Sequence, residues 1–143
     1  MKKTNGLLRV SRGRQISVFL EDKPGTLGTV CRQLGAAGVN ILALSLAEGI
    51  DHGYLRIVTS APDLAIATLK AADYLFYEKE VVLVEAACRP GVLGEVAQRW
   101  GAAGINIEYC YCGTSSDDAF SLLAARVDDP TKAAAILAED ADR

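Results

Sequence analysis

The stretch PGTLGTVCRQLGAAGVNI, residues 24–41, returns further along the chain as PGVLGEVAQRWGAAGINI, residues 90–107. The two segments align without a gap and are identical at 11 of 18 positions. An internal repeat of this kind indicates two copies of one structural unit, each of about 65 residues. No linker rich in glycine, serine or proline separates the copies, so we expect repeat 1 over residues 15–80 and repeat 2 over residues 81–143.

The residues around the first quoted stretch predict how one repeat folds. Within residues 15–21, Ile16, Val18 and Leu20 alternate with Ser17, Phe19 and Glu21, which is typical of a strand. A Pro-Gly turn follows, and Leu27, Val30 and Leu34 then recur at helical spacing until Gly38, which favours a helix end. Further strands are expected at 41–48 and 54–59, a helix from Pro62 to about Ala72, and β structure over 75–87.

The second repeat shows the same order of patterns. A strand at 81–87 is followed by a helix through Trp100, strands at 107–112 and 119–127, and a helix that Asp129 caps and Pro130 begins. This order predicts an α+β fold of two ferredoxin-like βαββαβ repeats, each an antiparallel sheet with its helices on one face. No segment after the last helix resembles a strand, so repeat 2 is expected to lack its last strand.

Several predicted strands are apolar on both faces. Leu42, Leu44 and Leu46 alternate with Ile41 and Ala43, so neither face of that strand has the polar side chains expected of a solvent-exposed face. Strands of this composition need cover on both faces. We therefore expect the second face to pack on the other repeat or on another chain, and we expect a homodimer.

Charge is distributed unevenly along the chain. Residues 1–14 carry five basic side chains and no acid, while the remaining ten basic and 18 acidic residues leave a charge of −8. We expect residues 1–14 to form a solvated basic tail, with a nucleic-acid arm as the alternative, and the acidic body to have no nucleic-acid partner. No apolar run reaches the roughly 18 residues that a membrane span needs, and no export signal is visible. A cytoplasmic location is the resulting expectation.

Candidate catalytic and metal-binding residues are sparse. The only histidine, His52, is predicted to lie in a solvated turn, and no nucleophile or metalloprotease motif occurs. Cys110 and Cys112 form a C-x-C motif, which without further ligands is a weak metal signal, and buried packing is the expected role of the cysteines. We expect no enzymatic activity, no cofactor and no metal site.

The turn after the first strand of each repeat is the candidate binding site. Gly25 and Gly91 allow a ligand to approach the backbone, and the following helix presents unpaired N–H groups that suit a carboxylate. Asn40 and Asp22 could read the charged groups of an amino acid. The alternative is that these residues only make tight turns.

The segments LEDKPGTLGTVCRQLGAAGVNI and ACRPGVLGEVAQRWGAAGINI resemble the signature of the ACT domain, over about residues 15–143. The resemblance implies ferredoxin-like modules that pair through their sheets and bind amino acids where the first turn faces a neighbour. It marks, as ligand-binding residues, Asp22, Gly25, Thr26, Leu27, Asn40 and Ile41 in repeat 1, and Cys88, Gly91, Val92, Leu93, Asn106 and Ile107 in repeat 2. Serine-binding members carry His and Asn where this chain has Leu20 and Asp22, so serine is not the expected ligand.

The resemblance implies a non-catalytic, allosteric regulatory protein whose ligand is an amino acid or similar small zwitterion. The alternative is a structural regulatory subunit that contacts a metabolic enzyme without binding a metabolite. A biosynthetic enzyme is a further expected partner in either case. The replacement of the acid by Cys88 favours repeat 1 as the better site.

Overall fold

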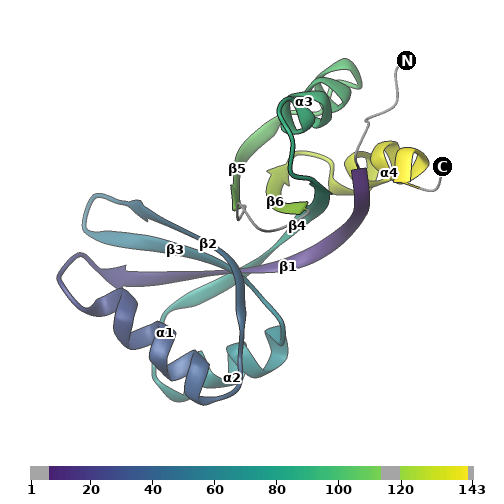
Figure 1. Ribbon diagram of the computed structural model, residues 1–143. Helices are drawn as coiled ribbons and strands as arrows, with labels where there is room; N and C mark the ends of the chain where they lie inside the picture. The colour runs from purple at the N-terminus through teal and green to yellow at the C-terminus, as the bar shows by residue number, and fades with distance from the viewer. Residues whose placement is uncertain (1–6, 114–119, 142–143) are drawn as a thin grey trace. The chain divides into compact units, whose positions relative to one another are not determined.

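The computed structural model describes residues 7–113 and 120–141, which form two units. One unit is Arg14–Lys79, and the other combines the chain up to Gly13 with Glu80–Arg143. Two long strands, β1 (Leu7–Glu21) and β4 (Phe76–Ala87), each run from one unit into the other (Figure 1). Each unit therefore contains part of β1 and part of β4.

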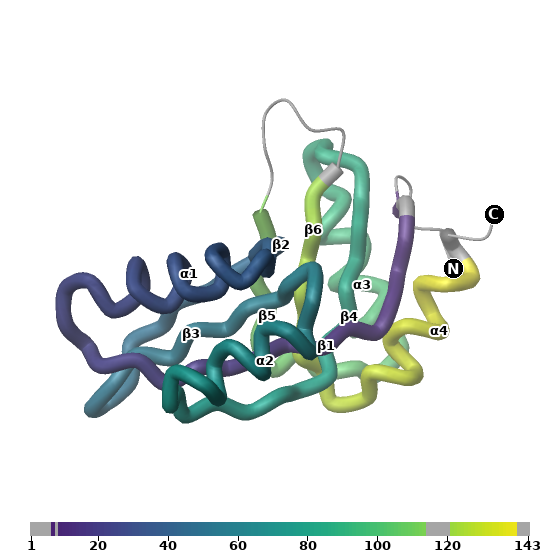
Figure 2. The backbone as a smooth tube through the Cα atoms, turned by 90° about the horizontal axis from the view of Figure 1, so that it is seen from below, coloured from purple at the N-terminus to yellow at the C-terminus, as the bar shows by residue number. Residues whose placement is uncertain are grey.

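The unit Arg14–Lys79 is one complete βαββαβ repeat. Its strands lie in the order β2-β3-β1-β4, and β3 pairs antiparallel with both β1 and β2. The helices α1 and α2 lie on the same face of this sheet (Figures 1 and 2). Between the two long strands, its elements are α1 (Thr26–Ala36), β2 (Ile41–Glu48), β3 (His52–Thr59) and α2 (Pro62–Ala71).

Alternating residues of the strands make the core of this unit. Ile16, Val18 and Leu20 of β1 are buried together with apolar residues of β3 and both helices. The other members of the buried cluster are Val30, Leu34, Val39, Leu55, Ile57, Ala65 and Leu69. The period-2 pattern and the helical spacing therefore mark these apolar side chains correctly. The opposite face of β1 is covered as well, because Gln15 and Ser17 are only 0% and 1% exposed.

The second unit repeats the same topology. Its strands lie in the order β1-β4-β6-β5, and β6 pairs antiparallel with both β4 and β5. Its further elements are α3 (Val92–Ala102), β5 (Ile107–Gly113), β6 (Phe120–Val127) and α4 (Pro130–Ala141). The predicted fold class of two ferredoxin-like βαββαβ repeats is confirmed; the predicted start of one strand at Ala119 lies outside the described residues.

The closing strand of repeat 2 requires a correction. The described residues end with α4, and Leu7–Gly13 of β1 takes the place of the closing strand beside β4. Leu7 and Val10 pack against the core of this unit. The prediction of a basic tail over 1–14 is thus wrong for residues 7–14, which are strand, while residues 1–6 lie outside the described part.

Ion pairs mark the register of β1 against β4 in each unit. Arg12 contacts Glu80 at 2.8 Å in the second unit, and Arg14 contacts Glu78 at 2.8 Å in the first. The residue on one strand rises by two as its partner on the other falls by two, as antiparallel pairing requires. Exposed pairs of this kind contribute about 0–1 kcal/mol each, so they indicate the register but add little to the stability.

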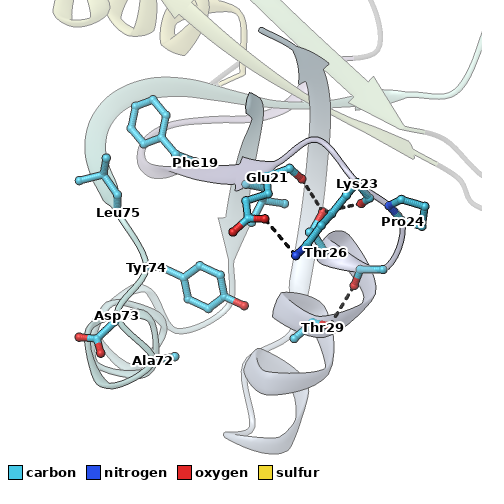
Figure 3. A pocket seen from close by; sticks show the side chains of 12 residues that line it. Phe19, Glu21, Lys23, Pro24, Thr26, Thr29, Ala72, Asp73, Tyr74 and Leu75 are labelled. Atoms are coloured by element: carbon cyan, nitrogen blue, oxygen red, sulfur yellow. Dashed lines mark hydrogen bonds and ion pairs between the residues drawn. The ribbon is translucent and has the colours of Figure 1, made fainter. Parts of the chain in front are cut away.

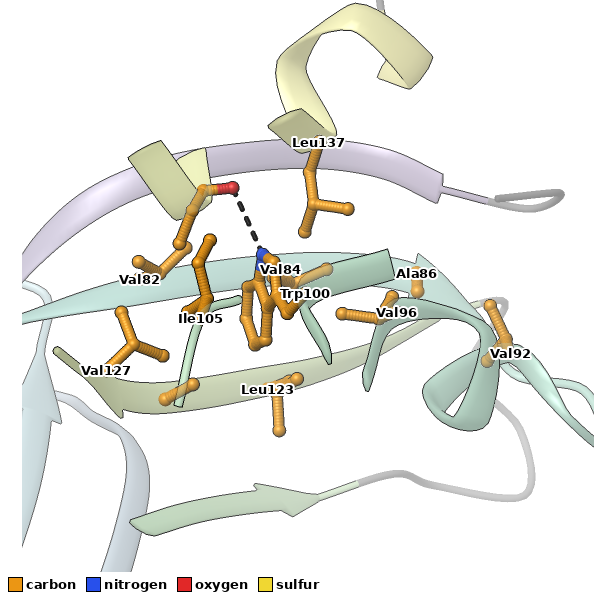
Figure 4. Close-up of a cluster of buried hydrophobic side chains, with 12 residues drawn as sticks. Val82, Val84, Ala86, Val92, Val96, Trp100, Ile105, Leu123, Val127 and Leu137 are labelled. Atoms are coloured by element: carbon orange, nitrogen blue, oxygen red, sulfur yellow. Dashed lines mark hydrogen bonds between the residues drawn. The ribbon is translucent and has the colours of Figure 1, made fainter. Parts of the chain in front are cut away.

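Trp100 lies at the centre of the second core (Figure 4). The indole is fully buried, and its Nε1–H donates to the carbonyl oxygen of Ala133 at 3.1 Å. The bond ties α3 to the first turn of α4, where Asp129 accepts from the N–H of Lys132 as the predicted cap. The fluorescence of this single tryptophan therefore reports on the second unit.

Removal of residues 1–13 should destabilise the second unit. The loss of the apolar contacts of Leu7 and Val10 and of a sheet edge should lower the unfolding free energy by roughly 2–4 kcal/mol. Urea unfolding followed by Trp100 emission measures this change. The exposed Arg9→Ala variant is the control and should stay within about 0.5 kcal/mol of the parent. An unchanged midpoint in the truncated chain would contradict the assignment of the closing strand.

Candidate functional site

The turn between β1 and α1 depends on one glycine. Gly25 has φ +93°, in the left-handed region, and Gly91 has φ +88° at the same place in the second unit. A side chain would strain either position, and no heavy atom lies within 4 Å of where a Cβ would stand. Backbone geometry, rather than crowding, therefore explains both glycines, and the space beside them is open.

The N-terminus of α1 has no side-chain cap and no acid in its first turn. The hydroxyl of Thr26 instead donates to the carbonyl oxygen of Glu21 at 3.0 Å, which holds the turn closed. The first N–H groups of a helix have no partner inside the helix, and they carry its positive dipole end. The first turn of α1 can therefore accept an anionic group.

The first turn of α3 differs in this respect. Glu95 stands in that turn, and its carboxylate contacts the Arg89 guanidinium at 3.0 Å. A carboxylate in the first turn already interacts favourably with the helix dipole. The two repeats therefore share the glycine turn, but only the second has a protein carboxylate in the first helical turn, where a ligand carboxylate would bind.

Two cavities lie on either side of the β1–α1 turn. The larger, of about 530 Å³, lies between this turn and the loop after α2 (Figure 3). It is lined by Phe19, Leu20, Glu21, Lys23, Pro24, Gly25, Thr26, Thr29, Ala72, Asp73, Tyr74 and Leu75. The smaller, of about 310 Å³, is lined by Leu20, Glu21, Asp22, Lys23, Gly25, Thr26, Leu27, Leu46, Ala47, Glu48 and Gly53.

Acids dominate the charged lining of the smaller cavity. Glu21, Asp22 and Glu48 line it together with a single base, Lys23, whose ammonium contacts the Glu21 carboxylate at 3.0 Å. Asp22 and Glu48 are exposed. The cavity thus offers carboxylates for an ammonium group beside a helix N-terminus for a carboxylate, and a zwitterion carries both charges.

Tyr74 forms a wall of the larger cavity. Its hydroxyl donates to the side-chain oxygen of Gln33 on α1 at 2.7 Å, which holds the ring against the helix. Burial raises the pKa of Tyr74, with a smaller contribution from Cys31, and burial also raises the pKa of the Cys31 thiol. Both groups are therefore protonated at neutral pH, so neither the Tyr74 hydroxyl nor the Cys31 thiol carries a charge.

Within one unit the structure does not bring all the predicted ligand residues together. Gly25 and Thr26 line both cavities, and Asp22 and Leu27 line the smaller one. Asn40 and Ile41 line neither, because α1 separates them from Gly25 by 11 residues, or about 16 Å of helix. The expectation of Asp22 and Asn40 at one locus is therefore wrong for a single unit.

Backbone bonds explain where Asn40 and Asn106 lie. The Asn40 N–H donates to Ser60 Oγ at 3.0 Å, and the Ser60 N–H donates to the Asn40 carbonyl at 2.9 Å. Asn106 makes the same exchange with Asp128, at 3.0 and 3.2 Å. Both asparagine side chains are left exposed.

The remaining predicted residues of repeat 2 divide between core and surface. Val92 is 2% exposed and belongs to the buried cluster, and Leu93 and Ile107 pack against it. Cys88 is exposed and Gly91 makes the turn. These apolar residues therefore act in packing.

Sequence reasoning missed the second wall of the larger cavity. Asp73, Tyr74 and Leu75 come from the loop after α2, about 50 residues from the glycine turn, and no local pattern connects the two. Asp73 has φ 60° and is the non-glycine residue with positive φ in the described chain. It ends α2, where its N–H donates to the Lys70 carbonyl and the Tyr74 N–H donates to the Leu69 carbonyl, so the left-handed φ belongs to the helix end.

His52 does not lie in a solvated turn as predicted. It begins β3, and its ring packs edge-on against the Phe19 ring, with the two ring centroids 5.0 Å apart. The centroid of the Tyr54 ring lies 4.9 Å from that of His52. Its Nε2 is buried without a hydrogen-bond partner. In residues 7–113 and 120–141, no three His, Cys, Asp or Glu side chains are grouped as metal ligands, and no helix is long and apolar enough to span a membrane.

Comparison with known proteins agrees with this architecture. The chain matches the family model of the ACT domain pair over residues 12–141, and it belongs to that family. ACT domains are regulatory modules. The crystal structure of protein BT0572 from Bacteroides thetaiotaomicron is similar, with 32% identity and a TM-score of 0.82 over 91% of this chain and 89% of that chain.

Regulatory subunits of aspartate kinase share the fold. The ligand-free subunit from Thermus thermophilus has 15% identity and a TM-score of 0.69, over 95% of this chain and 99% of that one. The subunit from Thermus flavus has 16% identity and a TM-score of 0.67, over 99% of this chain and 97% of that chain. No curated protein matched the chain.

Substitution of Gly25 should test the turn. Gly25→Ala must hold an L side chain at φ +93°, so it should lower the unfolding free energy by about 1–3 kcal/mol. Gly101→Ala is the control, because Gly101 lies inside α3 with open space around it and should gain up to about 1 kcal/mol. Urea unfolding followed by circular dichroism measures both. A neutral Gly25→Ala would contradict the strained turn.

Proposed function

We propose that this ACT domain pair is a non-catalytic regulatory protein that binds an amino acid at the first turn of the unit Arg14–Lys79. The observation that carries the proposal is the uncapped N-terminus of α1 beside a cavity lined by Glu21, Asp22 and Glu48. The ligand carboxylate would accept from the N–H groups of the first helical turn. Its ammonium group would pair with Asp22 or Glu48.

The equivalent place in the second unit is a weaker candidate. Glu95 already occupies the first turn of α3, and Cys88 stands where the first unit has Asp22. The Glu95 carboxylate would compete with a ligand carboxylate for the start of α3, and the ligand's ammonium would lose an ionic partner. One site per chain, in the unit Arg14–Lys79, is therefore proposed.

We further propose a homodimer that pairs through the β2 edge. Strand β2 is the edge of its sheet, and Leu42, Leu44 and Leu46 on it are 49%, 45% and 49% exposed. Unpaired edge groups and a row of exposed leucines favour pairing with another strand. On the nearby α1, Gly28 and Gly35 stand seven residues apart with open space at each, so another helix could approach closely.

Such pairing supports a role for Asn40. Two antiparallel β2 strands related by a two-fold axis place the start of one strand beside the end of the other. The partner subunit's Asn40 would then lie near Glu48, which lines the smaller cavity. Its amide could complete the ligand site that a single chain leaves open.

In this proposal, regulation follows from the shared site. A ligand that binds between two copies stabilises one arrangement of the dimer over others, and a partner that prefers that arrangement responds to it. The expected partner is a biosynthetic enzyme in the cytoplasm. The similar aspartate kinase structures, described as regulatory subunits, support a partner of this kind.

Calorimetry after a thermal-shift screen of the twenty amino acids tests the site. For the amino acid that binds, Asp22→Ala and Asn40→Ala should each weaken affinity roughly tenfold to a hundredfold, because each removes a bond to a charged group. Asn106→Ala is the matched control, with the same backbone bonds in the second unit, and should change affinity little. Equal losses at Asn40 and Asn106 would contradict a single site. Absence of binding to every amino acid would favour a structural subunit.

The dimer is tested separately by light scattering. Leu44→Lys places a charge in the exposed row on β2 and should convert the dimer to a monomer at micromolar concentration. Leu64→Lys is the control, because Leu64 on α2 is equally exposed, at 44%, but lies away from the β2 edge. A parent chain that is already a 15.2 kDa particle, or equal effects of both variants, would rule out this interface.

A further inference from the structure

Cys110 and Cys112 form a pair of thiols on one face of the edge strand β5. They pair in register with Ala125 and Leu123 of β6, so the two side chains point to the same side of the sheet. Both are exposed and neither forms a disulfide. The expectation that cysteines act as buried apolar residues is therefore wrong for this pair, because β5 lies at the edge of its sheet.

The repeat shows what these thiols replace. The alignment of the two copies places Cys110 and Cys112 at the positions of Leu44 and Leu46 on β2, which are likewise exposed at an edge. The second unit thus carries two sulfur ligands where the first carries two leucines. The two edges therefore differ in chemistry, because thiols can release a proton and bind a metal ion and leucine side chains cannot.

The spacing suits a bridging ion better than a disulfide. Residues two apart on a strand have Cα atoms about 6.6–6.8 Å from one another. This distance is at the upper limit for a disulfide, and parallel side chains add strain. A metal ion that binds both sulfurs needs no direct S–S bond, so this Cα spacing limits it less than it limits a disulfide.

The number of ligands selects the ion. In the described residues no third His, Cys, Asp or Glu joins the pair. Structural zinc takes four ligands, of which this edge would supply half. Thiolates are soft ligands that favour Cu(I), and two of them are enough for this ion.

We propose that Cys110 and Cys112 chelate one soft monovalent cation of the Cu(I) type per chain. On binding, each thiol releases its proton to solvent and donates a sulfur lone pair, and the ion keeps its oxidation state. The site lies in the second unit and does not depend on the amino-acid site of the first.

Anaerobic titration of the full chain with Cu(I), in competition with a chromophoric Cu(I) chelator, tests the site. The parent should bind one ion per chain. Cys110→Ser and Cys112→Ser should each weaken binding about a hundredfold, because each removes the gain from a linked second ligand. Cys88→Ser is the control and should bind as the parent does; Cys88 is also exposed but lies outside β5. Trp100 emission should confirm that each variant is folded.

Three results would overturn the proposal. An equal loss of Cu(I) affinity in Cys88→Ser would show that any surface thiol binds the ion. Undiminished binding in the Cys110→Ser, Cys112→Ser double variant would place the ion elsewhere. Half an ion per chain, or tighter binding of Zn²⁺ than of Cu(I), would replace the two-thiolate site by one shared between two copies.

Discussion

The fold depends on two strands that each contribute residues to both units. Strand β1 is the closing edge strand of one unit up to Gly13 and an inner strand of the other from Arg14 onward, and β4 does the reverse. Each repeat therefore completes its sheet with residues from the long strand that begins the other. Arg12 with Glu80 and Arg14 with Glu78 mark the register on either side of this exchange.

The exchange leaves β2 and β5 as sheet edges and leaves the glycine turn after β1 open. The backbone at Gly25 and Gly91 is nearly the same, yet the two turns differ in charge. An uncapped helix start with acids nearby suits a zwitterion, whereas a first turn that already holds Glu95 does not. The two repeats thus have equivalent backbone turns, and a few side chains around each turn determine which ligand it can bind.

Much of this could be predicted from the sequence because the determining patterns are local. The repeated Pro-Gly turn, the helical spacing of Leu27, Val30 and Leu34, and the cap at Asp129 each act within a few residues. The closing strand Leu7–Gly13 was missed because its pairing with β4 joins segments about 70 residues apart, and its basic side chains resemble a tail. The position of Asn40 was wrong for a similar reason. Asn40 is close to Gly25 in the sequence motif, but the helix α1 between them holds the two residues far apart in space.

The site can be tested most directly by NMR titration of the ¹⁵N-labelled chain with each amino acid. If a ligand carboxylate binds at the start of α1, the largest amide shifts should fall on Thr26, Leu27 and Gly28, whose N–H groups form the first helical turn. Their counterparts Val92, Leu93 and Gly94 should shift little. Largest shifts in that second set, or no shift with any amino acid, would contradict the account.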